Sequence, residues 1–282
     1  MTQPKGRIIF LHGFTQSSSI FYAKTSALRK KLLKSNYDII YLNAPLKLTP
    51  ADFPTTDSLS KFGTVIAEPD EETNYRAWWF KNTGKIDTVP AIATIEKFLE
   101  TGQVHEDDDT KDKKYLASYK ETDEVPIVGV IGFSQGAALA GALARNFNTL
   151  FGAKASGKLD LRFVVSYSGF KVEFDEFKGF YEFDSSNVEK KDAFKMLHVI
   201  GELDSVVEED RALSLYKEFE SKSDILKHPG GHFVPNSKML IDQVVNWIEN
   251  AMIHEKAETE KKEDDLDDLD ALMDMMDNLG KV

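Results

Sequence analysis

The chain has 282 residues, 41% of them hydrophobic, which is enough to bury one substantial core or two small ones. Its formal net charge is −12, and the last 29 residues, with 11 acidic and four basic side chains, hold −7 of it. This balance argues against nucleic acid as a ligand, because phosphate binding needs a concentrated positive face. The absence of cysteine excludes disulfides, thiolate metal sites and a cysteine nucleophile.

No window approaches the roughly 18 consecutive apolar residues that a membrane span needs. The first residues, MTQPKGRIIFLHG, lack the apolar stretch and the small-residue cleavage site of a signal peptide. We therefore expect a soluble protein without a membrane span, located in the cytoplasm, with the nucleus as a second location.

The first elements form a strand, a helix and a strand. An apolar strand over Arg7–Leu11 ends in His12-Gly13-Phe14, helical spacing follows over Tyr22–Leu33, and a second strand covers Tyr37–Leu42. This order is typical of a parallel sheet. The His-Gly pair after a strand has two interpretations: an ordinary turn, or a loop in which the backbone N–H of Phe14 supplies half of an oxyanion hole.

Residues 46–85 form a long irregular segment, which in a compact domain is usually functional or disordered. Its aromatic residues include Phe53, Phe62, Tyr75, Trp78, Trp79 and Phe80. These side chains either line a substrate pocket, with Trp78, Trp79 and Phe80 as the candidate contacts, or pack the segment onto the body. A helix is predicted next, over Val89–Leu99.

Residues 101–124 are dominated by Asp, Glu and Lys. The acidic run at 106–109 lacks the spacing of an EF-hand loop, so we expect a solvated insertion and no metal site.

The centre of the chain is the stretch 125–140, an apolar run that stops at Ser134 and continues as a helix of small residues. Gly132 and Gly136 flank the serine in the pattern G-x-S-x-G, which predicts a sharp strand-to-helix turn that exposes the serine hydroxyl. Such a turn holds the serine backbone in a strained conformation that costs about 1–3 kcal/mol.

Three further strands follow the elbow helix, which is predicted over Ala137–Phe147. Apolar runs at 161–167 and 196–200 predict the first two, and the second of these ends in a loop that carries Asp204. The carboxyl edge of an open parallel sheet is where its chemistry is usually placed. The alternative is that Asp204 serves only the start of the next helix, predicted over Glu208–Glu220.

A short strand over Asp224–Lys227 leads into HPGGHFVP, before a last helix predicted over Lys238–Met252. The two glycines allow a loop that brings His232 back over the serine, with Phe233 beside it as a candidate substrate contact. His228, at the end of the strand, is the rival histidine.

Ser134, Asp204 and His232 therefore occur in the chain order of an α/β-hydrolase triad, each after a predicted strand. His232 would remove the serine proton, and Asp204 would orient and stabilise the imidazole. Backbone N–H groups of Phe14 and Gln135 would receive the oxyanion. This chemistry needs no cofactor and no metal ion.

Seven segments carry a resemblance to a known family: LHGFTQS, YLNAP, YRAWW, GFSQG, SGF, GELDSVV and HPGGHFVP. Over roughly residues 6–252 the chain resembles the FSH-type fungal family of serine hydrolases, related to the animal ovarian-cancer-associated serine hydrolase and to fungal polyketide thioesterases. The resemblance implies an α/β-hydrolase fold: a mostly parallel sheet of about six strands with helices on both faces. It implies an esterase or thioesterase acting on small acyl substrates, with Ser134, Asp204 and His232 as its triad. The insertion and the tail lie outside the pattern of this resemblance.

We expect two parts: a hydrolase domain over residues 1–253, and an acidic tail over 254–282. Leucine and methionine recur at helical spacing over 264–279, so this segment is either an amphipathic helix that docks on a protein partner or a disordered solubilising tail. The leading function is a serine hydrolase of carboxylic esters or thioesters that works through an acyl-serine intermediate. The alternatives are a non-catalytic binding protein that recruits partners through the tail, and a serine peptidase.

Overall fold

The computed structural model describes residues 3–49, 52, 74–82, 85–102, 125–152, 159–182 and 194–253. Phe53 and Phe62, the acidic insertion beyond residue 102 and the tail over 254–282 lie outside the described residues. What the sequence predicts for these segments therefore stays a prediction.

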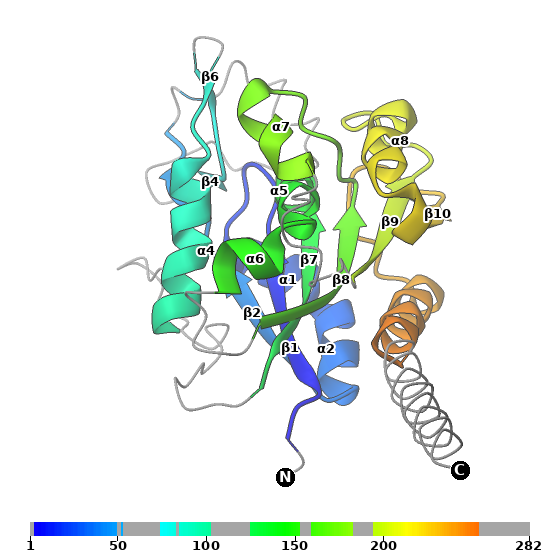
Figure 1. Cartoon of the computed structure of the whole chain (residues 1–282). Helices are drawn as coiled ribbons and strands as arrows, with labels where there is room; N and C mark the ends of the chain where they lie inside the picture. The colour runs from blue at the N-terminus through cyan, green and yellow to red at the C-terminus, as the bar shows by residue number, and fades with distance from the viewer. Residues whose placement is uncertain are drawn as a thin grey trace, which may run out of the picture.

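The centre of the fold is a six-stranded sheet in which every neighbouring pair is parallel (Figure 1). Its strand order is β10-β9-β8-β7-β1-β2. The strands are β1 (Gly6–Leu11), β2 (Tyr37–Leu42), β7 (Ile127–Phe133), β8 (Leu159–Tyr167), β9 (Lys195–Gly201) and β10 (Ser223–His228). Two short antiparallel pairs lie apart from it: β3 (Leu46–Lys47) with β4 (Arg76–Ala77), and β5 (Lys81–Asn82) with β6 (Lys85–Ile86).

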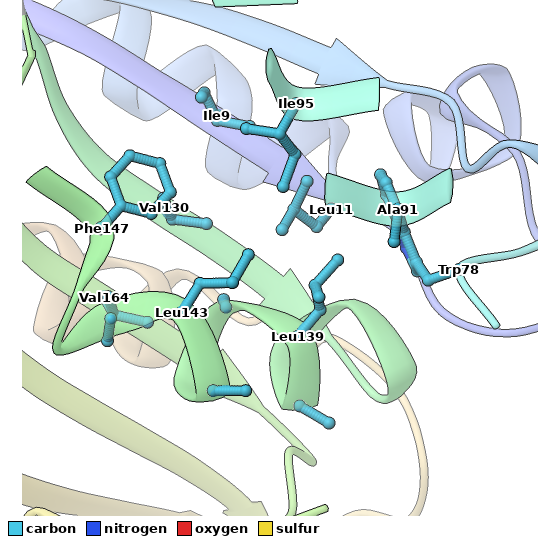
Figure 2. Close-up of a cluster of buried hydrophobic side chains, with 14 of the residues drawn as sticks. Ile9, Leu11, Trp78, Ala91, Ile95, Val130, Leu139, Leu143, Phe147 and Val164 are labelled. Carbon is cyan, nitrogen blue, oxygen red and sulfur yellow. The ribbon is translucent and has the colours of Figure 1, made fainter. Parts of the chain in front are cut away.

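Helices cover both faces of this sheet, which confirms the predicted α/β-hydrolase architecture. Alternate residues of β1 serve the two faces, because successive side chains of a strand point to opposite sides. Ile9 and Leu11 pack in the core cluster that Figure 2 shows, whereas Ile8 and Phe10 belong to the cluster on the other face. The first face carries α4 (Val89–Thr101), α5 (Gln135–Ala144), α6 (Phe147–Gly152), α7 (Asp175–Tyr181) and α8 (Glu209–Glu218), and the second α1 (Ser18–Lys24), α2 (Ser26–Lys34) and the helix over 238–253.

The single helix predicted over Tyr22–Leu33 is in fact two helices, α1 and α2, that meet at Thr25. The Thr25 hydroxyl donates to the Phe21 carbonyl at 2.7 Å and lies 2.7 Å from the Tyr41 hydroxyl. A threonine side chain that bonds backbone in this way competes with the regular helix. The contact with Tyr41 on β2 fixes the position at which α1 ends and α2 begins. The helical spacing of apolar residues in the sequence cannot reveal this contact.

The helix predicted over Ala137–Phe147 also differs from the observed helices. It begins directly after Ser134 as α5 and ends at Ala144, and a separate short helix, α6, starts at Phe147.

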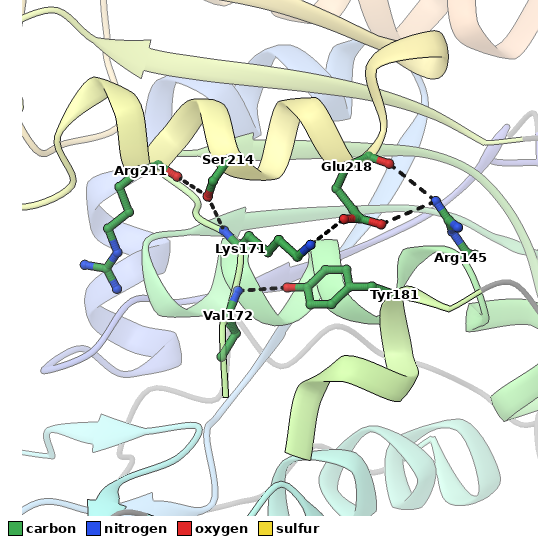
Figure 3. Close-up of polar contacts among 7 residues, drawn as sticks. All are labelled: Arg145, Lys171, Val172, Tyr181, Arg211, Ser214 and Glu218. Atoms are coloured by element: carbon green, nitrogen blue, oxygen red, sulfur yellow. Dashed lines mark hydrogen bonds and ion pairs between the residues drawn. The ribbon is translucent and has the colours of Figure 1, made fainter. Parts of the chain in front are cut away.

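A polar network fastens the loop after β8 to helix α8 (Figure 3). The Glu218 carboxylate accepts from the Lys171 ammonium at 2.6 Å and lies 3.8 Å from the Arg145 guanidinium. The backbone N–H of Lys171 donates to the Ser214 hydroxyl. These contacts hold the end of α5, the loop at 168–174 and α8 together.

None of the helices in the described part of the chain is long and apolar enough to cross a membrane.

Candidate active site

Ser134 occupies a sharp turn between β7 and α5. Its backbone has φ 51° and ψ −116°, and a positive φ is uncommon for a residue with a side chain. The turn is fixed from both sides, because the Ser134 N–H donates to the Tyr167 carbonyl and the Ala138 N–H donates to the Ser134 carbonyl. Strain of this kind costs about 1–3 kcal/mol and persists where the surrounding structure enforces it.

The two glycines of the motif are required by close backbone contacts. A Cβ on Gly136 would lie 2.2 Å from the Leu11 carbonyl oxygen, and one on Gly132 would lie 2.4 Å from the Cα of Ala137. Both neighbours are backbone atoms, which cannot rotate away from an added methyl group as a flexible side chain can. The G-x-S-x-G spacing is therefore what lets α5 pack directly against β7 and β1.

The structure brings Ser134, His232 and Asp204 together from three separate loops. The Ser134 hydroxyl lies 3.1 Å from His232 Nε2, and His232 Nδ1 lies 2.8 Å from Asp204 Oδ2. The other Asp204 oxygen accepts the backbone N–H groups of Val206 and Val207, each at 2.9 Å. With an ionised Asp204, Nδ1 carries the ring hydrogen and Nε2 is left to accept from the serine.

The surroundings of Asp204 keep it ionised. Burial raises the pKa of this carboxyl, but the hydrogen bonds from His232 and Val207 and the interaction with the His232 charge lower it more, so the pKa lies below its ordinary value. The Ser168 hydroxyl adds a smaller lowering effect on the same pKa.

Ser168 is a residue whose role the sequence does not reveal. Its backbone has φ 47°, its N–H donates to the Val199 carbonyl, and its Oγ is buried without a hydrogen-bond partner of normal geometry among the described residues. The SGF segment of the family resemblance contains this serine, but the pattern assigns it no role.

The rival histidine, His228, has a different environment. It ends β10, where its Nδ1 accepts the Gly230 N–H at 3.2 Å and its ring lies 5.4 Å from that of Phe233. His228 therefore supports the glycine loop that carries His232, while His232 itself contacts Ser134 and Asp204.

His12 anchors the predicted oxyanion loop. Its Nε2 accepts the Ala44 N–H at 3.0 Å, so Nδ1 carries the hydrogen and donates to the Gly13 carbonyl at 2.8 Å. Complete burial lowers the pKa of His12 to about 4, so the ring is neutral at physiological pH. This histidine ties the end of β1 to the end of β2.

The backbone on both sides of Phe14 is held in place. The Gly13 N–H donates to the side chain of Gln16 at 3.3 Å, and the Thr15 N–H donates to the Arg76 carbonyl at 3.1 Å. Phe14 thus lies in a turn of fixed geometry. The second predicted donor, the Gln135 N–H, belongs to the first turn of α5, whose N–H groups have no intrahelical acceptor.

The predicted substrate contacts Trp78 and Trp79 lie in the packed core. Trp78 is fully buried, and its indole N–H donates to the His12 carbonyl at 2.9 Å. The Gln135 side chain accepts the Trp78 N–H at 2.8 Å and donates to the Trp79 carbonyl at 2.9 Å. At Trp78 and Trp79 these contacts favour the alternative in which the aromatic side chains pack onto the body.

Phe80 and Phe233 are more open than the two tryptophans. Phe80 is partly buried, with its ring edge-on to that of Phe14 at 6.5 Å. Phe233 is 49% exposed and lines a cavity of about 410 Å³ beside His232. Of the four predicted substrate contacts, Phe233 is the one that lines the cavity beside His232.

The fold and the serine-histidine-aspartate arrangement together define an α/β-hydrolase of the serine type. A family model described as "Serine hydrolase (FSH1)" matches residues 1–244. The chain belongs to this FSH1 serine hydrolase family, which confirms the resemblance seen in its sequence.

Relatives and solved structures agree with this membership. The chain is 36% identical over 298 residues to "Family of serine hydrolases 3" of Saccharomyces cerevisiae, with 99% of both chains covered, so this similarity extends beyond residues 6–252. It is 31% identical to "Esterase OVCA2" of Danio rerio, covering 81% of this chain and 90% of the relative. The structure resembles the crystal structure of acyl-protein thioesterase 2 of Zea mays, with a TM-score of 0.54 and 20% sequence identity. The match covers 89% of this chain and 95% of the thioesterase chain, and it is a similarity of fold.

Proposed function

We propose that this serine hydrolase cleaves carboxylic esters or thioesters of small acyl substrates through an acyl intermediate on Ser134. The observation that carries the proposal is the contact chain from Ser134 Oγ through His232 to Asp204, at 3.1 and 2.8 Å, built on a strained elbow. The zebrafish relative is named an esterase, which supports ester substrates.

In the first step, Ser134 Oγ attacks the acyl carbon while its proton passes to His232 Nε2. Asp204 holds the imidazole in the required tautomer and stabilises its positive charge. The bond to the leaving alcohol or thiol then breaks, and His232 returns the proton to the leaving oxygen or sulfur. The products of this half-reaction are acyl-Ser134 and the free alcohol or thiol.

In the second step, water replaces the leaving group. His232 takes a proton from the water, the hydroxide attacks the acyl carbon, and collapse releases a carboxylic acid and the Ser134 hydroxyl. Both steps pass through a tetrahedral oxyanion, which the N–H groups of Phe14 and Gln135 receive in this proposal. One such donor is typically worth about 10²–10³ in rate.

The test is hydrolysis of p-nitrophenyl esters of graded acyl length alongside matched acyl thioesters. We expect turnover with the wild-type chain and its loss in Ser134→Ala, with unchanged unfolding behaviour in the variant. Folded wild-type protein that turns over neither class of substrate would contradict the proposal.

The domain division and the tail form a second proposal. We propose a hydrolase domain over 1–253 and a tail over 254–282 whose apolar spacing at 264–279 docks on a protein partner; the alternative for a segment with a charge of −7 is a solubilising tail, which would capture no partner. A chain truncated after residue 253 should keep esterase activity and lose a partner captured by the full chain. Loss of activity on truncation would contradict this division.

The cysteine-free composition fits a reducing compartment such as the cytoplasm, where we place the reaction.

A further inference from the structure

The cavity beside His232 has an apolar body and a polar rim. Phe133, which directly precedes the nucleophile, and Phe233 contribute apolar walls, and His232 lies within 4.8 Å of the Phe133 ring, centroid to centroid. Lys24 and Gln16 supply polar atoms from the segment after β1. At about 410 Å³ the cavity can hold a small organic group.

The chemistry of acyl transfer indicates which part of a substrate this cavity receives. In the tetrahedral intermediate, the leaving oxygen or sulfur must lie within hydrogen-bond reach of His232, which returns the proton to it. The side chain of Phe14, whose backbone N–H is a proposed oxyanion donor, packs with Phe80 and Tyr75 and is not among the residues that line this cavity. Because His232 lines this cavity and Phe14 does not, the cavity is the candidate position for the leaving group.

Among the described residues that line this cavity, Lys24 is the only lysine or arginine, and none of them is a carboxylate. Lys24 has no ion-pair partner among the described residues, a property that it shares with exposed lysines such as Lys30 and Lys34, so what sets it apart is its place on the cavity lining. Although the residue is exposed overall, partial burial lowers the pKa of Lys24.

We infer that the cavity binds the leaving-group part of the substrate and that Lys24 selects alcohols or thiols that carry a negative charge, as a carboxylate or a phosphate. The inference rests on the proposed function and narrows its substrate class. The acyl part then lies on the other side of Ser134, towards Phe14 and Phe80.

The test compares three butyryl thioesters that differ in the leaving thiol: 3-mercaptopropionate, 2-mercaptoethyl phosphate and the neutral 3-mercaptopropionamide. Because the chain has no cysteine, a thiol-reactive dye reports the released thiol without background from the protein. We expect kcat/KM for at least one anionic thioester to exceed that for the amide by about fivefold, the size of one partly exposed charge pair. The preference should fall as salt is added. Comparing kcat/KM for the carboxylate thioester with kcat/KM for the phosphate thioester shows which of the two anions the cavity prefers.

Three variants assign the preference to Lys24. Lys24→Gln should bring the ratio of the anionic to the neutral kcat/KM close to one, and Lys24→Arg should keep it. Lys30→Gln removes the same charge from an exposed position on α2, outside the cavity lining, and should leave the ratio unchanged.

Equal kcat/KM values for all three thioesters in the wild-type chain would overturn the inference while leaving the proposed function intact. So would a preference that survives in Lys24→Gln, or a Lys24→Gln variant that only loses stability at the end of α1. Absence of turnover with every thioester and with p-nitrophenyl esters would instead contradict the proposed function itself.

Discussion

The side chain of Gln135 accepts a hydrogen bond from the backbone N–H of Trp78 at 2.8 Å. The residue that follows the nucleophile thereby joins the elbow to a segment 57 positions earlier in the chain. Its amide nitrogen completes the connection by donating to the Trp79 carbonyl. The backbone of Gln135 is a proposed oxyanion donor, so one residue links the site's chemistry to the packing of the aromatic segment.

Replacing Gln135 with Met keeps the side-chain volume and leaves a buried donor and a buried acceptor unsatisfied. We expect the free energy of unfolding to fall by about 2 kcal/mol or more. Urea denaturation measures it, with Lys30→Met on the exposed face of α2 as a control that should change it by no more than about 0.5 kcal/mol. Equal stability of the two variants would show that the Gln135 contacts carry no net energy.

Gly136→Ala tests the close approach of α5 to β1. The new methyl group would lie 2.2 Å from the Leu11 carbonyl oxygen, so backbone must move, and we expect a loss of about 2–3 kcal/mol in unfolding free energy together with a loss of esterase activity. Gly179→Ala is the matched control, because nothing lies within 4 Å of a Cβ at that position on α7. Helix propensity alone should then raise stability by about 0.5–1 kcal/mol. Normal activity in Gly136→Ala would contradict the packing argument.

Two buried histidines make stability depend on pH. Burial lowers the pKa of His12 and of His198 from 6.5 to about 4. The unfolded chain therefore takes up protons below pH 6.5 that the folded chain does not accept until about pH 4, and the free energy of unfolding falls as the pH drops through this window.

The measurement is chemical denaturation at several values between about pH 7 and pH 4, in wild type and His198→Gln. Each histidine contributes a slope of up to about 1.4 kcal/mol per pH unit, so the variant should show a shallower decline by one such contribution. Parallel pH profiles for the two proteins would mean that His198 is not kept neutral by the fold.

Asp204→Asn tests the orienting role of the carboxylate. An asparagine can still accept from the Val206 and Val207 N–H groups, but its amide nitrogen facing His232 favours the wrong ring tautomer, and kcat should fall by about 10⁴. Asp224→Asn, at an exposed site that accepts from Trp247, is the isosteric control and should retain activity. A mild effect in Asp204→Asn would assign the orienting role to another group.

Much of the architecture could be predicted from local sequence pattern. The strand at Tyr37–Leu42 matches its predicted bounds, and Ser134, Asp204 and His232 each follow a strand as expected, because apolar runs and strand-end loops are local signals. The break at Thr25 and the burial of Trp78 could not be predicted in this way. Both depend on partners distant in the chain, Tyr41 in one case and Gln135 with His12 in the other.

Lys24 illustrates the same limit. In the sequence it is one basic residue among several in a helical stretch, and only the arrangement of the loops after β1, β9 and β10 places it on the rim of the cavity beside His232.

The most direct test of the central claim is the site of covalent labelling by a fluorophosphonate. If Ser134 is the activated nucleophile, its oxygen displaces fluoride, and peptide mapping by mass spectrometry should find a single adduct on Ser134 in the folded chain. Ser134→Ala and urea-unfolded wild type should remain unlabelled, and His232→Ala should label far more slowly. A folded wild-type chain that resists the probe, or that carries the adduct on a different serine, would contradict the account.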